Sequence, residues 1–351
     1  MNQDSQDKAN VTGRKKQLML GIDLGTSKIA VCSERGSKAM FRSVVGYPRD
    51  IIGSHLLKGD KAIGEEVLEK RSFLDAYYPL EEGVIKEESE GVIAALKDLL
   101  QHAVSLAKPE KGDEICAVIG APAGATYSNK EPILKAAREF MKVALVVSEP
   151  FMVAYGMNKL NRAIIVDIGA GTTDICALTG TIPSAEDQST ILKGGDYIDK
   201  VLNALLLETY PEIQLTPQLA RKIKEKYAFV GEIKESKMVK FRENGKPKDY
   251  DAANEIKAAC ETLILPIVEQ IENLLLQFDP DDQEEALKNI YLAGNGSRIR
   301  GLDTAIIEAL SEYGEVKVSL IDDPDYAGCT GALKLATDIP LEHWSQVGDQ
   351  L

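Results

Sequence analysis

The stretch IIVDIGAGTTDI, residues 164–175, decides the fold. Its first part is a short run of apolar, mostly β-branched residues, which predicts a buried strand ending near Asp167. A glycine turn leaves backbone N–H groups uncovered for an anion, and a carboxylate at a strand end can hold a hydrated divalent cation. The stretch therefore predicts a phosphate-binding turn beside a metal-binding carboxylate. Its candidate phosphate contacts are Gly169, Gly171, Thr172 and Thr173.

The same pattern occurs near the start of the chain. Residues 18–31, LMLGIDLGTSKIAV, run from an apolar strand through Asp23 to a small polar turn and a second apolar run. Asp23 and Asp167 are 144 residues apart, about one domain length. Two like hairpins at this spacing predict two similar domains that hold one nucleotide from both sides. The candidates in the first turn are Gly25, Thr26, Ser27 and Lys28, of which Lys28 either neutralises phosphate or points into solvent.

Composition excludes several classes of protein. The 351 residues carry a net charge of −14 with a pI near 4.9, so direct binding to nucleic acid or anionic lipid is not expected. The five scattered cysteines form no CxxC or Cys/His cluster, so we expect buried free thiols and no zinc site. No apolar run is long enough to predict a membrane span. Residues 1–16 are polar and are expected to form a disordered tail that is neither a signal peptide nor a membrane anchor.

Strands alternate with helices over residues 17–150, which predicts an α/β sheet covered by helices. Glu149 directly follows a strand at 143–147, and Pro150 is suited to open a helix. Glu149 is therefore expected at a strand tip, where such sheets build their sites, although a helix-capping or solvated Glu is the alternative. Later elements are expected as helices at 130–142, 197–209, 216–227, 252–277 (broken near Pro266) and 332–337, a hairpin turn at 243–246 and a strand at 316–321.

Five separated motifs together resemble the actin superfamily, whose fold is shared with Hsp70-type ATPases and sugar kinases. The resemblance runs from about residue 17 to residue 337, and Asn295 departs from it by standing where a third glycine is expected. Asn tolerates positive φ, so the turn is expected to survive. The motifs lie at residues 23–26, 149–150, 167–174, 223–226 and 293–297. Further stretches resemble the magnetosome actins among the bacterial actins, at residues 43–48, 113–120, 146–151, 297–302 and 343–349.

The resemblance implies an α/β, actin/Hsp70-type ATPase fold. Two similar domains, each with a mixed sheet flanked by helices, would enclose a nucleotide cleft. The first domain would comprise residues 17–164 and 316–351, with a small insert near 47–77. The second would comprise residues 165–315, with an insert near 205–263.

The resemblance also implies ATP and Mg²⁺ as cofactors and gives the candidate residues roles. Asp23 and Asp167 would hold Mg²⁺ largely through water. Glu149 would position or activate the attacking water, so these three acids are the catalytic candidates. Lys224 and Glu225 would reach the ribose or adenine, with an exposed helix face as the alternative. The other side of the base would be lined by Gly294, Asn295, Gly296 and Arg298.

The function implied by the resemblance is slow ATP hydrolysis coupled to the turnover of dynamic cytoplasmic filaments. The filament would form by head-to-tail self-association and position magnetosomes in a chain through an adaptor protein. No direct nucleic-acid contact or membrane insertion is expected. The alternatives are a plasmid-segregating or rod-shape actin and a small-molecule kinase of the same fold. An Hsp70-like chaperone would need a further client-binding domain, which the end at Leu351 does not leave room for.

Overall fold

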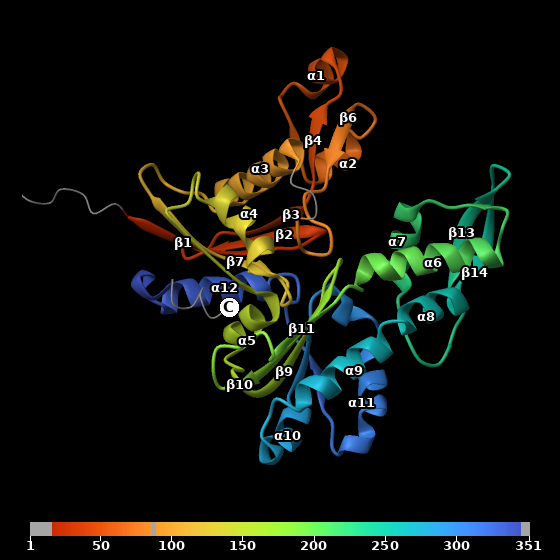
Figure 1. Ribbon diagram of the computed structural model, residues 1–351. Helices are drawn as coiled ribbons and strands as arrows, with labels where there is room; N and C mark the ends of the chain where they lie inside the picture. The colour runs from red at the N-terminus through yellow and green to blue at the C-terminus, as the bar shows by residue number, and fades with distance from the viewer. Residues whose placement is uncertain (1–15, 86–88, 345–351) are drawn as a thin grey trace, which may run out of the picture.

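The computed structural model describes residues 16–85 and 89–344, and two five-stranded sheets form its frame (Figure 1). Their strand orders are β3-β2-β1-β7-β8 and β11-β10-β9-β15-β16. Each repeat of the sequence pattern forms an antiparallel hairpin at the centre of its sheet, and each first strand also pairs in parallel with a later strand. The predicted α/β organisation with two similar units is confirmed. The hairpins are β1 (Gln17–Leu24) with β2 (Lys28–Ser33), and β9 (Asn161–Ile168) with β10 (Thr173–Thr179).

The remaining strands complete both sheets in the same way. The first sheet adds β3 (Lys38–Arg42), β7 (Glu114–Ala121) and β8 (Val143–Ser148). The second adds β11 (Gln188–Ile191), β15 (Ile290–Ala293) and β16 (Val318–Leu320). Helices on the first unit are α3 (Glu90–Leu106), α4 (Tyr127–Ala137), α5 (Glu149–Met157) and α12 (Ala327–Asp338). Those on the second are α6 (Gly195–Thr209), α7 (Pro217–Tyr227), α8 (Ala253–Glu261), α9 (Ile264–Leu275), α10 (Pro280–Leu287) and α11 (Leu302–Ala309).

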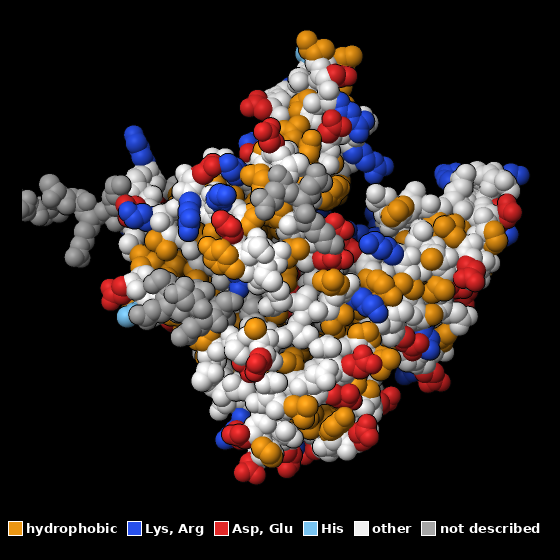
Figure 2. Space-filling view, viewed as in Figure 1, with side chains coloured by type: hydrophobic (Ala, Val, Ile, Leu, Met, Phe, Trp, Pro, Cys, Tyr) orange, Lys and Arg blue, Asp and Glu red, His pale blue; other side chains and the backbone are white. Residues whose placement is uncertain are grey.

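Two small sheets lie within the expected inserts and form two separate arms in Figure 1. One arm holds the sheet β5-β4-β6, and the other holds the sheet β12-β13-β14 beside α6, α7 and α8. Figure 2 shows the molecule notched between these arms. The first arm consists of β4 (Val45–Pro48), α1 (Ile51–Leu57), β5 (Ala62–Ile63), α2 (Glu65–Glu69) and β6 (Leu74–Tyr77). The strands of the second are β12 (Ile213–Gln214), β13 (Met238–Glu243) and β14 (Lys246–Asp251).

The helices α5 and α12 lie between the two large sheets. They share one apolar core with both sheets, to which Val118 comes from the first and Ile165 from the second. The close fit depends on glycine, because a Cβ on Gly331 of α12 would stand 1.8 Å from the carbonyl oxygen of Met152 in α5. A Cβ on Gly21 of β1 would likewise stand 2.0 Å from the carbonyl oxygen of Cys329. Backbone therefore packs directly on backbone at the centre of the molecule.

Several helix bounds differ from the sequence prediction for identifiable reasons. The helix expected over 252–277 breaks at residues 262–263, before Pro266, because proline is tolerated in the first turn of the following helix. The helix expected at 130–142 begins at Tyr127, because Thr126 and Asn129 form a capping box. The short helix expected at 332–337 begins earlier, at Ala327. The hairpin turn at 243–246 is confirmed.

The proposed domain bounds stay a prediction, but the strand pairing differs from them near the end of the chain. Residues from 316 onward were assigned to the first domain. The strand β16 pairs in parallel with β15 of the second sheet, whereas α12 packs against β1 of the first. The chain therefore crosses between the sheets after Leu320, in the loop that precedes α12.

Other sequence expectations concern the thiols and the two ends of the chain. All five cysteines are buried and free. Among the described residues, no helix has the length and apolar character needed to cross a membrane. The expected tail at 1–16 lies outside the described residues except for Lys16, and the resemblance at 343–349 lies outside them beyond Trp344.

Candidate functional site

A cavity of about 380 Å³ lies between the two units, where both central hairpins end. This volume is within the usual range for small-molecule sites. Most of the residues predicted from the sequence line the cavity, so the fold brings together motifs that are far apart in the chain. These lining residues are Asp23, Gly25, Thr26, Ser27, Lys28, Glu149, Asp167, Gly169, Lys224, Glu225, Gly294, Asn295, Gly296 and Arg298.

The floor of the cavity is acidic. Asp23 and Asp167 are the next-to-last residues of the two central strands, and Glu149 is the first residue of α5. Burial raises the pKa of Asp23 to about 6. Burial, and then the charges of the neighbouring carboxylates, raise the pKa values of Asp167 and Glu149 well above their ordinary values. A cation placed among these groups would relieve their mutual repulsion.

The donor set fits a hydrated magnesium ion. Within the described residues, no three His, Cys, Asp or Glu side chains lie close enough to hold a metal ion directly. A cation here would therefore keep most of its water, as Mg²⁺ does in proteins. Burial disfavours the charged forms of Asp23 and Asp167 and raises their pKa values, and a cation beside them would favour the ionised carboxylates.

Asp174 is a fourth acid, buried beside this floor without lining the cavity, and the sequence analysis gave it no role. Its carboxylate accepts hydrogen bonds from Thr172 Oγ1 at 2.7 Å, Thr190 Oγ1 at 2.5 Å and the backbone N–H of Ala123 at 2.8 Å. In the β9–β10 hairpin Asp174 stands directly opposite Asp167. Like charges directly opposite each other destabilise a sheet. Two acids placed to face each other in one predicted hairpin could therefore have indicated a site.

The second turn borders the cavity with only part of its length. Gly169 lines the cavity, but Gly171, Thr172 and Thr173 do not. The Thr172 hydroxyl donates to Asp174, and the Thr173 hydroxyl donates to the carbonyl oxygen of Lys193 at 2.8 Å. Gly171 packs on the first unit, where a Cβ would lie 2.6 Å from Thr26 Oγ1. The two hydroxyl groups thus stabilise the hairpin itself.

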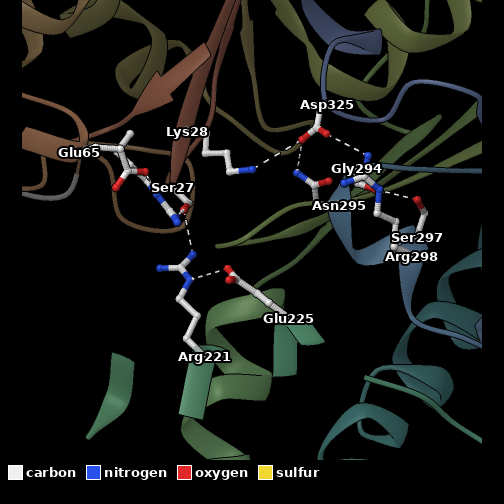
Figure 3. Close-up of polar contacts among 11 residues, drawn as sticks. Ser27, Lys28, Glu65, Arg221, Glu225, Gly294, Asn295, Ser297, Arg298 and Asp325 are labelled. Carbon is white, nitrogen blue, oxygen red and sulfur yellow. Dashed lines mark hydrogen bonds and ion pairs between the residues drawn. The ribbon is translucent and has the colours of Figure 1, made fainter. Parts of the chain in front are cut away.

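Two arginines that the sequence analysis missed meet at the first turn. Ser27 Oγ accepts hydrogen bonds from Arg42 Nη1 at 3.1 Å and from Arg221 Nη2 at 2.8 Å (Figure 3). Arg221 lies on α7 of the second unit, so its contact crosses the cleft. Both arginines line the cavity beside Lys28. Arg221 could have been found, because it precedes Lys224 by one helical turn on α7.

The predicted pair on α7 has two different environments. Lys224 Nζ donates to the carbonyl oxygen of Gly195 at 2.6 Å and pairs with Asp199 at 2.8 Å. Its side chain is only 11% exposed, which rules out the alternative of a solvated helix face for this residue. Glu225 is half exposed and pairs with Arg221 at 3.3 Å.

Asp325 joins three of the predicted residues, and it too was missed. It accepts hydrogen bonds from Asn295 Nδ2 and Arg298 Nη2, both at 2.9 Å, and its carboxylate is 3.6 Å from Lys28 Nζ (Figure 3). Asp325 lies in the loop where the chain crosses from the second sheet to α12. One carboxylate therefore links the turn at residues 294–298, the crossing loop and the first hairpin.

The turn with Asn295 survives as expected, but not through positive φ at Asn295. Gly294 adopts φ +66°, and Asn295 begins the short 3-10 helix η1 (Asn295–Arg298). A Cβ on Gly294 would stand 2.4 Å from Asp167 Oδ1. Gly294 therefore supplies the backbone freedom, while the Asn295 side chain is free to reach Asp325.

Replacing Asn295 with Gly is expected to weaken nucleotide binding by about three- to tenfold, because the turn loses its hydrogen bond to the Asp325 carboxylate. Competition with a fluorescent ATP analogue would measure the change. Asn244→Gly, at the remote β13–β14 turn, is the matched control and is expected to bind normally. Unchanged affinity in Asn295→Gly would show that this contact does not hold the turn.

Comparisons with known proteins agree with this architecture. The MreB/Mbl protein family matches residues 17–342. The chain is 50% identical over 335 residues to the actin-like protein MamK of Paramagnetospirillum magneticum, covering 95% of this chain and 96% of that protein.

Two solved structures are also similar at 50% sequence identity. A MamK double helical filament has a TM-score of 0.90 and covers 93% of this chain and 100% of its own. A non-polymerising MamK mutant bound to AMPPNP has a TM-score of 0.73 and covers 92% of this chain and 99% of its own. Since the family match spans nearly the whole chain and the MamK likeness covers 95% of it, this chain belongs to the MreB/Mbl family of bacterial actin-like proteins.

Proposed function

We propose that this chain binds ATP with Mg²⁺ in the cleft, hydrolyses it slowly, and assembles head to tail into filaments. The observation that carries the proposal is that the two central hairpins meet at one cavity. They place Asp23 and Asp167 at its floor, and basic side chains from both units line it. The AMPPNP-bound and filamentous forms of MamK support it, because AMPPNP is an analogue of ATP.

The proposed roles follow the chemistry of each position. Mg²⁺ would supply charge neutralisation at the phosphates, and Asp23 and Asp167 would hold it through water. Glu149 would orient the attacking water, since phosphoryl transfer depends on positioning and charge stabilisation. The phosphates would be bound by residues 25–28, by the turn at 169–173, and by Arg42 and Arg221. The adenosine would be bound by Lys224, Glu225, Gly294, Asn295, Gly296 and Arg298.

Opposite charge at the two ends of the second unit supports head-to-tail association. The β13–β14 hairpin at the tip of one arm carries the exposed cations Lys240, Arg242, Lys246 and Lys248 beside the acids Glu243, Asp249 and Asp251, which leaves a small positive excess. The far end of the unit carries α10, whose residues 279–285 include five acids. Figure 2 shows basic and acidic side chains together at the first of these ends and mostly acidic ones at the other. Such ends attract in a polar filament and repel when like ends meet, and salt would weaken the attraction.

The proposed cargo follows from the MamK likeness. We infer that the filament lies in the cytoplasm and organises magnetosomes into a chain through an adaptor protein. A rod-shape or plasmid-segregating role shares the same chemistry with another cargo, and the 50% identity to MamK favours the magnetosome role.

Sedimentation combined with phosphate release tests the proposal. Wild-type protein would be spun down with ATP, with ADP and without nucleotide, each at low and high salt. The expected result is pelleting that depends on ATP and falls at high salt, with slow release of phosphate. Protein that stays in solution under every condition would overturn the filament proposal and favour the small-molecule kinase alternative.

A further inference from the structure

Two thiols meet where β2 contacts α12. The sulfur atoms of Cys32, on β2, and Cys329, on α12, lie 2.9 Å apart. These residues are 297 positions apart in the chain, so the fold alone creates the pair. Within the described residues, no other two thiols share a hydrogen bond. The remaining cysteines, Cys116, Cys176 and Cys260, are each buried singly.

The surroundings of the pair favour a thiolate at Cys32. Thr330 Oγ1 lies 3.8 Å from its sulfur, and Lys38 lies on the neighbouring strand β3 directly opposite Cys32. The Lys38 ammonium pairs with Asp323 at 2.6 Å and stands 4.0 Å from the ring centroid of Tyr326. The hydrogen bond from Cys329 lowers the pKa of Cys32 to about 7. Burial instead raises the pKa values of the three single thiols.

The geometry is close to that of a cross-link. A disulfide requires a sulfur–sulfur distance near 2.05 Å, so the two sulfurs need to approach by about 0.9 Å. Cys32 is 5% exposed and Cys329 is fully buried, which excludes bulky reagents. A hydroperoxide is small enough to reach Cys32 from the surface that Lys38 and Asp323 form.

We propose that Cys32 and Cys329 are a redox modification site, at which a hydroperoxide forms an intramolecular disulfide between β2 and α12. The Cys32 thiolate attacks one peroxide oxygen, the O–O bond breaks, and Cys32 becomes a sulfenic acid while hydroxide leaves. The Cys329 sulfur then attacks the sulfenic sulfur, and the S–S bond forms as water leaves with the Cys329 proton. The peroxide gains two electrons and the two thiols lose them. In the unfolded chain, where the disulfide is accessible, a dithiol reverses the reaction by exchange.

The disulfide would form one residue away from the acidic floor of the cleft. Gly328, which precedes Cys329, packs on Asp23, and a Cβ there would lie 2.6 Å from Asp23 Oδ2. Asp23 is on β1, which pairs with β2. Oxidation would therefore fix α12 covalently against the hairpin that carries Asp23.

Peptide mass spectrometry on folded wild-type protein tests the proposal directly. The protein would be treated with hydrogen peroxide, alkylated, unfolded, alkylated with a second reagent and digested. We expect the peptides of Cys32 and Cys329 to be joined with the loss of two hydrogens, and to separate with dithiothreitol. Cys116, Cys176 and Cys260 serve as controls in the same chain, because they are expected to react only with the second reagent.

Two variants distinguish this chemistry from general oxidation. In Cys329→Ser, the sulfenic acid on Cys32 has no thiol partner, so a dimedone adduct is expected at Cys32 when the oxidised protein is unfolded in the presence of dimedone. In Cys260→Ser, the cross-link is expected to form as in wild type. Cys32 and Cys329 remaining unlinked in oxidised wild-type protein would overturn the proposal, as would cross-links that involve the single thiols equally.

Discussion

Replacing Glu149 with Gln is expected to slow ATP hydrolysis about 10²-fold or more while ATP-dependent assembly persists. A positioned general base contributes on the order of 10²–10⁴-fold to a rate, and Gln keeps the size of the side chain without its basicity. Glu149 lines the cavity at the start of α5, close to the carboxylates of Asp23 and Asp167. Phosphate release and sedimentation, measured on the same samples, would separate the two effects.

The pH dependence provides a second measurement on Glu149. Burial, followed by the charges of Asp23, Asp174 and Asp167, raises its pKa well above the ordinary value. A protonated carboxyl cannot accept a proton from water, so phosphate release in wild type is expected to fall as the pH is lowered. The residual activity of Glu149→Gln is expected to lack this fall. Glu186→Gln, in an exposed loop, is the control. Loss of assembly with normal hydrolysis in Glu149→Gln would contradict the assigned role.

Replacing Asp167 with Asn is expected to stabilise the protein without ligands and to abolish most of its stabilisation by Mg²⁺ and ATP. Burial and the charges of Asp23 and Asp174 raise the pKa of Asp167, so its charged form is unfavourable in the fold. Removing this unfavourable charge should raise the melting temperature of the free protein by about 2–4 °C, corresponding to about 1 kcal/mol. The stabilisation that a ligand gives depends on its dissociation constant. Because Asp167→Asn removes a carboxylate that would hold Mg²⁺, the rise in melting temperature on adding Mg²⁺ and ATP should become much smaller.

The sign of the pH effect follows from the raised pKa values. Between the unfolded pKa near 3.8 and the higher folded value, the folded state binds more protons than the unfolded state. The stability of free wild-type protein is therefore expected to decrease as the pH rises through this window, which for Asp23 ends at about 6. Melting curves in EDTA from pH 5 to 8 would be flatter for Asp167→Asn. Asp249→Asn, on the exposed β14, should follow wild type. A lower melting temperature for free Asp167→Asn would contradict the account.

Local sequence was sufficient for the elements that carry the site. The apolar strands that end at Asp23 and Asp167 pair with the runs that follow them, as the alternation of apolar stretches and glycine turns indicated. The position of Glu149 at the start of a helix followed from Pro150, which is suited to the first helical turn. Each of these inferences used neighbours within a few residues, where chain geometry leaves few alternatives.

Contacts between distant segments could not be predicted in the same way. The meeting of Arg42 and Arg221 at Ser27 depends on how β3 of the first unit and α7 of the second unit face the cleft. The role of Asp325 depends on where the chain crosses between the sheets. No spacing in the sequence encodes these distances. The partners of the Thr172 and Thr173 hydroxyls, Asp174 and Lys193, could not be predicted for a related reason, since they are determined by the folded hairpin.

The direct backbone packing of α12 also has a consequence for synthesis of the chain. The first sheet is complete in sequence at Ser148, but the helix that covers its inner face ends only at Asp338, about 190 residues later. At a translation rate of roughly 5–20 residues per second, this delay lasts on the order of 10–40 s. Until α12 has been synthesised, the apolar face of the first sheet on which it packs stays uncovered by that helix. Before α12 is in place, Gly328 cannot pack on Asp23, so a nascent chain lacks part of the acidic floor of the cleft. Growing filaments should therefore incorporate only chains whose synthesis is complete.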